Sequence, residues 1–178
     1  AIGNNYFRYF DLLVATAITT SGQLSIRWVE KSFNIYLNRR LKTTGVDYVI
    51  ASDTDSVYVT FESLVAEKFK SGEQTSEIVN FLDAFAKEEL EPFIDKSYEA
   101  LAKRMNAYDQ KMQMAREAIA STGIWTAKKR YILNVWDMEG VRFKEPYLKI
   151  MGIEAVKSST PAPCREKIKQ ALKIIING

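Results

Sequence analysis

The sequence predicts an α+β fold in which a mostly antiparallel sheet carries helices packed on one face. Helical periodicity is confined to three stretches, residues 11–42, 76–106 and 160–178. Short runs of β-branched and aromatic residues lie between these stretches and are joined by short turns. Sequential strands joined by short turns imply antiparallel pairing, and helices packed on such a sheet give the α+β class.

The first predicted helix covers residues 11–42. Asp11 is a suitable N-cap because its carboxylate can accept a hydrogen bond from the first turn. Apolar side chains then recur at helical spacing on one face, at Ile26, Val29, Phe33, Tyr36 and Leu37. Basic residues fill the last turns and Gly45 follows, a pattern typical of a helix end.

Two strands are predicted next, at residues 47–51 and 57–61, around the turn Asp53-Thr54-Asp55-Ser56. The connection is so short that the strands must form an antiparallel hairpin. Two carboxylates at one hairpin tip repel each other unless a positive charge lies close by. This raises the question of which cation the tip would hold.

The second predicted helix covers residues 76–106 and should kink or break near Pro92, whose ring removes a backbone hydrogen bond. Strands are predicted after it, with a turn at residues 137–140 that leads into the short run 141–143. The predicted strands are residues 111–119, 130–136 and 146–152.

The last predicted helix begins at Thr160 as N-cap with Pro161 in the first helical position. Its apolar face is predicted to comprise Ile168, Ala171, Leu172 and Ile175. No repeat and no long linker interrupts the sequence, so residues 1–178 are predicted to form one domain.

Composition limits the possible chemistry. Histidine is absent, which excludes histidine-dependent zinc sites and catalytic triads within these residues. The single cysteine, Cys164, has no internal disulfide partner, and this fits a cytoplasmic location. Any bound metal would need carboxylate and carbonyl ligands, which favours Mg²⁺, Mn²⁺ or Ca²⁺. No apolar run is long enough to cross a bilayer, so no membrane partner is expected.

Charge is unevenly distributed along the chain. Residues 44–100 contain four Lys and Arg against thirteen Asp and Glu, whereas residues 120–178 contain eleven against five. This segregation suits a protein that holds cations in one place and a polyanion in another. Solvated acidic helices would give the same pattern.

Several interpretations of the aspartate pair remain open from the residues alone. Aspartate is a common turn residue, so Asp53 and Asp55 could act only in forming the hairpin turn. An EF-hand loop is unsuitable, because Val57, Tyr58 and Leu64 occupy positions that need oxygen ligands or glycine. The pattern D-x-D-x-[TV] after an apolar strand resembles the first motif of haloacid-dehalogenase-type phosphohydrolases, in which Asp53 would be the nucleophile. That family requires an open loop and a parallel sheet after the motif.

Four sequence blocks together resemble family B DNA polymerases, and T-even-type phage polymerases in particular. They are "AIGN" at residues 1–4, "DTDSVYV" at 53–59, "KKRY" at 128–131, and "LNVWDMEGVRF" with "LKIMGIEAVKSSTP" after it. Their order matches the end of the fingers motif, the palm carboxylate motif, the conserved basic motif and the segments that follow it. The resemblance covers nearly the whole chain and implies a palm domain, with residues 160–178 leading towards a thumb.

The resemblance implies template-directed nucleotidyl transfer with two Mg²⁺ ions. Asp55 would be the principal metal ligand and Asp53 a supporting one, with Thr54 and Ser56 holding the turn. Glu117 resembles a further carboxylate near the metals, although an exposed strand residue is an equal interpretation. Phage relatives carry an aspartate at the position of Ala115, which weakens this assignment.

The basic motif Lys128-Lys129-Arg130-Tyr131 is the candidate contact with primer–template DNA. On a strand, Lys129 and Tyr131 would share one face, and Lys128 and Arg130 the other. By resemblance, Lys129 would probe the minor groove at the primer terminus, while Arg130 and Lys128 would lie near the backbone or support the sheet. A solvated basic face is the structural alternative, and Tyr131 is equally suited to the core.

The family pattern is incomplete in these residues. Its Tyr-Gly before Asp53 is replaced by Ala51-Ser52, and its other metal-binding motif, D-x-x-S-L-Y-P-S, is absent together with the fingers residues that hold deoxynucleoside triphosphates. We therefore expect the isolated chain to be inactive, either as a truncated fragment or as one half of a split polymerase that needs a complementary chain supplying the exonuclease, the fingers and the other aspartate. A dehalogenase-type phosphohydrolase and a non-catalytic DNA-binding module are the alternative functions.

Overall fold

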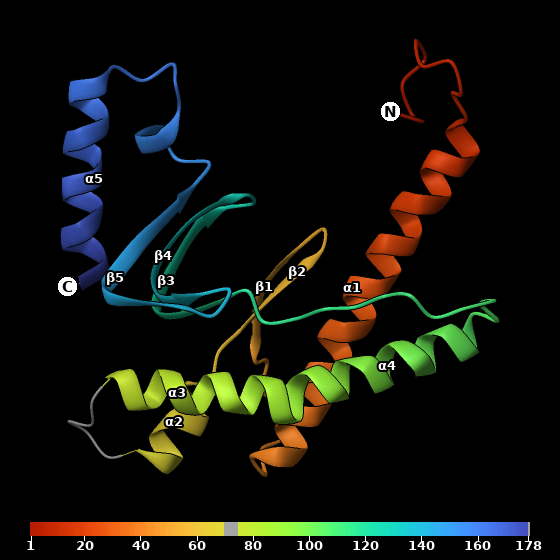
Figure 1. Ribbon diagram of the computed structural model, residues 1–178, viewed down its shortest axis with the longest axis horizontal. Coiled ribbons are helices and arrows are strands. Elements are labelled where there is room, and N and C mark those ends of the chain that lie inside the picture. Colours follow the sequence, from red (N-terminus) through yellow and green to blue (C-terminus); the bar gives the residue numbers. More distant parts are fainter. Residues whose placement is uncertain (70–74, 178) are drawn as a thin grey trace. The chain divides into compact units, whose positions relative to one another are not determined.

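The computed structural model describes residues 1–69 and 75–177, which belong to two compact units. Unit 1 comprises Ala1–Glu73 and Leu90–Met114, and unit 2 comprises Gln74–Glu89 and Ala115–Gly178. The predicted α+β class is confirmed (Figure 1). The strands of the described residues form two antiparallel sheets, one of two strands and one of three, where the sequence predicted one. The assignment of the whole chain to a single palm domain stays a prediction.

Unit 1 begins with the long helix α1 (Leu12–Arg40), as predicted. Asp11 caps it, with its Oδ1 accepting a hydrogen bond from the Val14 amide at 2.9 Å. The buried residues are spaced four apart in the second half of the helix, at Ser25, Val29, Phe33 and Leu37. None of the helices in the described part of the chain has both the length and the apolar composition needed to cross a membrane.

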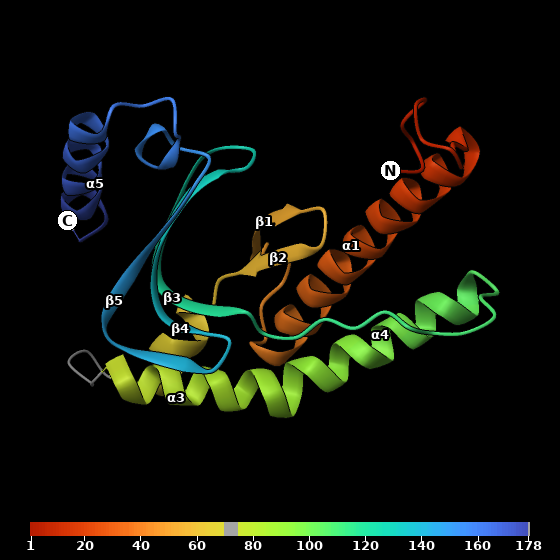
Figure 2. The same ribbon diagram turned by 45° about the horizontal axis from the view of Figure 1, so that its top comes forward.

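Helix α4 (Glu91–Arg104) packs on this buried face of α1 (Figures 1 and 2). The Phe93 ring stacks on Tyr36 with ring centroids 4.5 Å apart, and the indole Nε1 of Trp28 donates to the Ser97 carbonyl at 2.9 Å. Burial raises the pKa of the neighbouring Tyr98 hydroxyl. The two helices therefore form the core of unit 1 through apolar and polar contacts together.

The predicted second helix exists but is not regular throughout. It comprises α3 (Thr75–Phe85), a π-helical segment η1 (Ala86–Leu90) and α4. The irregularity lies directly before Pro92, where it was predicted. Pro92 cannot donate to the carbonyl four residues earlier and its ring crowds that carbonyl, so a widened turn lets the helix continue.

The predicted hairpin is confirmed as β1 (Val49–Asp53) and β2 (Ser56–Val59), which pair antiparallel. The strands lie one or two residues from the predicted bounds. A short helix that the sequence did not predict, α2 (Glu62–Lys68), follows β2. In Figures 1 and 2 the hairpin lies beside α1, and the two are in contact.

Unit 2 contains the three-stranded sheet, with β4 (Arg130–Met138) between β3 (Ala118–Ala127) and β5 (Val141–Met151). The β4–β5 turn is formed by Glu139 and Gly140, which have φ of 51° and 84°. Positive φ at both positions matches the twist of a two-residue hairpin. The turn predicted at residues 137–140 is therefore confirmed.

Two strand predictions in this region were wrong. Residues 111–117 are not a strand, because β4 ends at Met138 and gives them no partner; pairing begins with Ala118 opposite Met138. The runs 141–143 and 146–152 are one strand, β5, which includes Pro146. An edge strand accommodates proline because one row of its amides faces away from the sheet.

Helix α5 (Ala162–Asn177) covers one face of this sheet, after a short 3-10 turn, η2 (Glu154–Val156). Its packing residues recur every four positions, at Ile168, Leu172 and Ile176, against Ile132. The prediction that Ile175 lies on the buried face was wrong, since this side chain is 61% exposed. Both the observed and the predicted residues have spacings that place them on one face of a helix. Packing against the sheet determines which of these two faces is buried.

Candidate functional site

Helix α1 fixes the start of the hairpin through two asparagines one turn apart. The Asn34 side-chain oxygen accepts from the amides of Tyr48 and Val49, at 2.8 and 3.3 Å. The Asn38 side chain donates to the Val46 carbonyl at 2.7 Å and accepts from the Val46 amide at 3.0 Å. These bonds satisfy backbone groups at the start of the hairpin, so they help to set where β1 begins.

The turn itself is held by Asp53 and Thr54. Asp53 and Ser56 are register partners, which leaves Thr54 and Asp55 as the two turn residues. The Asp53 Oδ1 accepts from the Thr54 amide at 2.8 Å and from the Thr54 hydroxyl at 3.1 Å. Such a side-chain bond to the following backbone is characteristic of aspartate in turns. Thr54 therefore engages Asp53 within the turn, and the predicted turn-supporting role of Thr54 and Ser56 stays a prediction.

Asp55 differs from Asp53 in its surroundings. It is exposed at the tip, and among the described residues its carboxylate has no hydrogen-bond or ion-pair partner. Asp53 is half-buried. The hairpin thus presents one carboxylate outward and uses the other for the turn.

The donor type at this tip fits Mg²⁺, which prefers carboxylate oxygens. Two carboxylates do not complete its octahedral coordination. No group of three or more acidic or cysteine side chains within residues 1–69 and 75–177 is arranged to hold a metal ion. Asp53 and Asp55 by themselves are therefore too few ligands for a complete magnesium site.

The replacement of the family's Tyr-Gly by Ala51-Ser52 does not strain the hairpin. Ser52 is not among the described residues with positive φ, so a side chain is tolerated there. Its hydroxyl lies 3.5 Å from Glu30 Oε2 on α1, a long hydrogen bond. The departure is therefore compatible with the local backbone.

Lys128 and Lys129 form the β3–β4 turn, so the predicted assignment of the basic motif to a strand was wrong for these two residues. Ala127 pairs with Arg130, and Lys129 adopts φ of 61°. Both lysines are exposed. We call Lys128 and Lys129 the lysine turn. Because a turn has no alternating faces, the predicted partition of the four motif residues over two faces does not apply.

Arg130 and Tyr131 begin β4 and are half-buried. The guanidinium of Arg130 lies 2.6 Å from both carboxylate oxygens of Glu154. The Tyr131 ring lies opposite Trp125 on β3, with ring centroids 6.3 Å apart. Both side chains are engaged with the sheet or with η2.

Glu117 immediately precedes β3 and is exposed. Its carboxylate forms an ion pair with Lys149 of β5, with Nζ and Oε1 2.6 Å apart. To bind a metal ion, the Glu117 carboxylate would have to give up its ion pair with Lys149 or contact the lysine and the metal at the same time. Glu117 and the lysine turn belong to unit 2, whereas the Asp53–Asp55 hairpin belongs to unit 1.

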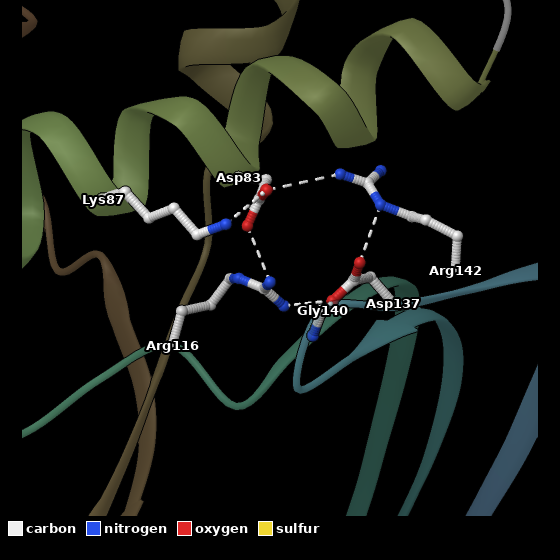
Figure 3. Close-up of polar contacts among 6 residues, drawn as sticks. All are labelled: Asp83, Lys87, Arg116, Asp137, Gly140 and Arg142. Atoms are coloured by element: carbon white, nitrogen blue, oxygen red, sulfur yellow. Dashed lines mark hydrogen bonds and ion pairs between the residues drawn. The ribbon is translucent and has the colours of Figure 1, made fainter.

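The residue before Glu117 belongs to a buried ionic cluster (Figure 3). Arg116 pairs with the fully buried Asp137 of β4 and, at 2.6 Å, with Asp83 of α3. Arg142 Nε lies 2.7 Å from the second oxygen of Asp137. A hydrogen bond from Lys87, together with the charge of Arg116, holds the pKa of Asp83 below its ordinary value. The cluster ties α3 to the β4–β5 hairpin and fixes the segment that carries Glu117.

No local pattern in the sequence indicated this cluster, since Arg116 and Asp137 are 21 residues apart. Glu154 and Lys149 were likewise not singled out. Gly152 could have been noticed, because an isolated glycine at the end of an apolar strand indicates a turn or a close backbone contact.

Comparison with known proteins identifies relatives over nearly the whole chain. It is 46% identical over 182 residues to a DNA-directed DNA polymerase of Escherichia phage RB69, an alignment that covers 97% of this chain and 20% of that protein. It is 43% identical over 188 residues to a DNA-directed DNA polymerase of Enterobacteria phage T4, covering 99% of this chain and 21% of that protein. No protein-family model matches the sequence.

The chain therefore spans about a fifth of the length of these relatives. It corresponds in sequence to one segment of T4-type phage DNA polymerases. The resemblance carried by the four ordered blocks is confirmed.

Proposed function

We propose, from this homology to one segment of phage DNA-directed DNA polymerases, that the chain is the palm-domain portion of a family B DNA polymerase. It would contribute part of the metal site through Asp55 and Asp53, and a primer–template contact through the lysine turn. The exposed Asp55 carboxylate at the tip of an antiparallel hairpin is the observation that carries the metal-site assignment.

The proposed reaction is attack of a primer 3′ hydroxyl on the α-phosphate of a deoxynucleoside triphosphate. Two Mg²⁺ ions about 4 Å apart would neutralise charge on the attacking and leaving oxygens. Asp55 would direct its carboxylate at this charge from a turn that Asp53 and Thr54 hold. Further carboxylates would come from outside this sequence, whether from the same protein or a complementary chain.

The lysine turn would bind primer–template DNA. Ammonium groups interact with phosphates and with minor-groove acceptors, which are similar for all base pairs. This suits a polymerase, which must hold DNA of any sequence. Action in the cytoplasm of an infected host cell belongs to the same proposal.

The phosphohydrolase alternative receives no support from the hairpin. That family needs an open loop and a parallel sheet after its aspartate motif. Here only Thr54 and Asp55 separate Asp53 from the antiparallel partner strand, which begins at Ser56. The non-catalytic DNA-binding module remains as an outcome of the test below.

A chimera tests the proposal directly. The aligned segment of the phage RB69 polymerase is replaced by this chain, and primer extension is measured in Mg²⁺. We expect extension, and we expect Asp55→Asn to reduce it by more than about 100-fold, since even residues that only support a metal ligand cost up to that factor. Asp109→Asn, an exposed aspartate outside the motif, is the matched control and should extend normally.

Two other outcomes would count against parts of the proposal. If the chimera folds, binds primer–template and extends it at the same rate with and without Asp55→Asn, the metal-ligand role of Asp55 is contradicted. A chimera that binds DNA and never extends would instead favour the non-catalytic module.

A further inference from the structure

Gly152 makes an unusually close backbone contact with the lysine turn. It follows β5 directly and has φ of 66°. A Cβ at this position would lie 2.2 Å from the Lys129 carbonyl oxygen and 3.2 Å from its carbonyl carbon. No side chain fits at such a distance, because the neighbouring atoms are backbone and cannot rotate away. Only glycine allows the end of β5 to support Lys129 in this way.

A second contact lies two residues further on. Glu154 of η2 receives the Arg130 guanidinium on both of its oxygens, at 2.6 Å each, and its Oε1 also accepts from Lys157 at 2.9 Å. The hydrogen bond from Lys157 is the main cause that lowers the pKa of Glu154 to about 2. Glu154 is therefore charged at neutral pH, as its pairing with the Arg130 guanidinium requires.

The two contacts act on consecutive residues of the basic motif. Lys129 has positive φ, which costs free energy for a residue with a side chain. Such a conformation persists only where surrounding contacts favour it. The segment after β5 supplies a backbone contact at Lys129 and an ion pair at Arg130, and both restrict the direction in which the lysine turn projects.

We propose that Gly152 and Glu154 are positioning residues for DNA binding by the lysine turn. Arg130 then anchors the motif to η2, and Lys128 and Lys129 make the contacts with the primer–template backbone and minor groove. This inference rests on the proposed function, because it deepens the role of the basic motif assigned there.

Gly140 provides a matched control for Gly152. It also has positive φ, 84°, in the β4–β5 turn of the same sheet, but a Cβ there would meet nothing within 4 Å. Alanine at either position incurs the conformational cost of positive φ. Only alanine at Gly152 collides with Lys129. The difference between the two variants therefore isolates the contact with the lysine turn from general strain.

The experiment measures fluorescence anisotropy of a labelled primer–template duplex titrated with the 178-residue chain over a salt series containing Mg²⁺. Lys129→Ala should weaken binding and reduce the slope of log affinity against log salt by about one, as expected for one lost phosphate contact. Gly152→Ala should raise Kd by about five- to ten-fold, comparable with the net contribution of one ordinary hydrogen bond. Gly140→Ala should leave Kd unchanged.

The Kd of a double variant distinguishes a positioning role from a purely structural one. If Gly152 acts through the lysine turn, Gly152→Ala added to Lys129→Ala should raise Kd by clearly less than the product of the two single effects. Amide hydrogen exchange at residues 128–130 should also accelerate in Gly152→Ala but not in Gly140→Ala. Equal Kd values for Gly152→Ala and Gly140→Ala, or multiplicative effects, would overturn the positioning role.

Glu154→Gln keeps the inference testable if Gly152→Ala does not fold. It removes the ion pair with Arg130 without a backbone collision, and it should also raise Kd. Combined with Lys129→Ala, it should raise Kd by less than the product of the two single effects. An unchanged Kd would overturn the proposal. Failure of the folded parent chain to bind DNA, or no effect of Lys129→Ala, would instead refute the DNA surface in the proposed function, and the positioning role with it.

Discussion

Two aspartates separated by one residue have different environments at the hairpin tip. The Asp53 carboxylate accepts two hydrogen bonds from Thr54, while Asp55 is exposed and has no partner among the described residues. A carboxylate that already accepts protein hydrogen bonds has less capacity left for a metal. The single turn therefore gives the two carboxylates different environments, and the ligand role of Asp55 and the supporting role of Asp53 stay predictions.

Glu154 allows a pH prediction at the same scale. Its pKa in the folded protein is about 2, against an ordinary value of 4.5. A depressed folded-state pKa contributes stability that is fully present above pH 4.5 and is lost as the pH falls towards 2. We expect Glu154→Gln to make the free energy of unfolding depend less on pH in this window.

Urea unfolding at several pH values between about 2 and 6 checks this, because that range includes both the folded and the ordinary pKa of the Glu154 carboxyl. Parallel pH profiles for Glu154→Gln and the parent chain would show that the charged pair contributes nothing to stability there.

The hairpin as an element depends on α1 as much as on its own strands. Asn34 and Asn38 face the chain segment that enters β1 and accept or donate bonds to its backbone. An asparagine on a helix surface can satisfy both an amide and a carbonyl, which few other side chains can do. The long helix thus fixes where the carboxylate-bearing turn starts.

Asn34→Ala tests this dependence. It leaves the amide of the buried Tyr48 without its acceptor, and we expect the free energy of unfolding to fall by about 1–3 kcal/mol. Urea unfolding measures the change, and faster amide exchange at Tyr48 and Val49 would locate it. Asn80→Ala, at an exposed position of α3, is the control and should change stability by less than about 0.5 kcal/mol. An equal loss in both variants would contradict the role of Asn34.

At the scale of the whole molecule, each compact unit has its own core. Unit 1 is built on Val29, Phe33 and Leu37 of α1 with α4, and unit 2 on Ile132 and Ile176 with their neighbours. The basic residues 120–178 lie entirely in unit 2, and the aspartate hairpin lies in unit 1. The basic C-terminal part of the sequence therefore belongs to one unit, whereas the acidic residues 44–100 are divided between the two.

Leu37→Ala tests whether the cores stabilise their units separately. Leu37 is fully buried, so we expect the substitution to destabilise unit 1 by about 2–5 kcal/mol. Amide hydrogen exchange should accelerate in residues 1–69 and 90–114 and change little in residues 115–177. Leu13→Ala on the exposed part of α1 should have no comparable effect, since this side chain is 83% exposed. Equal acceleration in both units would show one cooperative unit instead.

Features that depend on neighbouring residues could be predicted from the sequence. Asp11 as N-cap, the hairpin around Asp53 and Asp55, the disruption before Pro92 and the Glu139-Gly140 turn all follow from local backbone preferences and side-chain periodicity. The ordered motifs, although far apart in the chain, were also sufficient to identify the polymerase relatives. Such features can be predicted because their physical cause lies within a few residues.

Features that depend on partners far away in the sequence could be found only from the tertiary structure. The start of β3 at Ala118 depends on the end of β4, and the buried face of α5 on the sheet beneath it. The pairing of Glu117 with Lys149, 32 residues away, and the contact of Gly152 with Lys129 have no local signature. The lysine turn could not be predicted from local residues either. Basic residues are not typical of turns, and the contact that favours positive φ at Lys129 comes from Gly152, directly after β5. Contacts of this kind are set by how the strands pair, which no short stretch of the sequence contains.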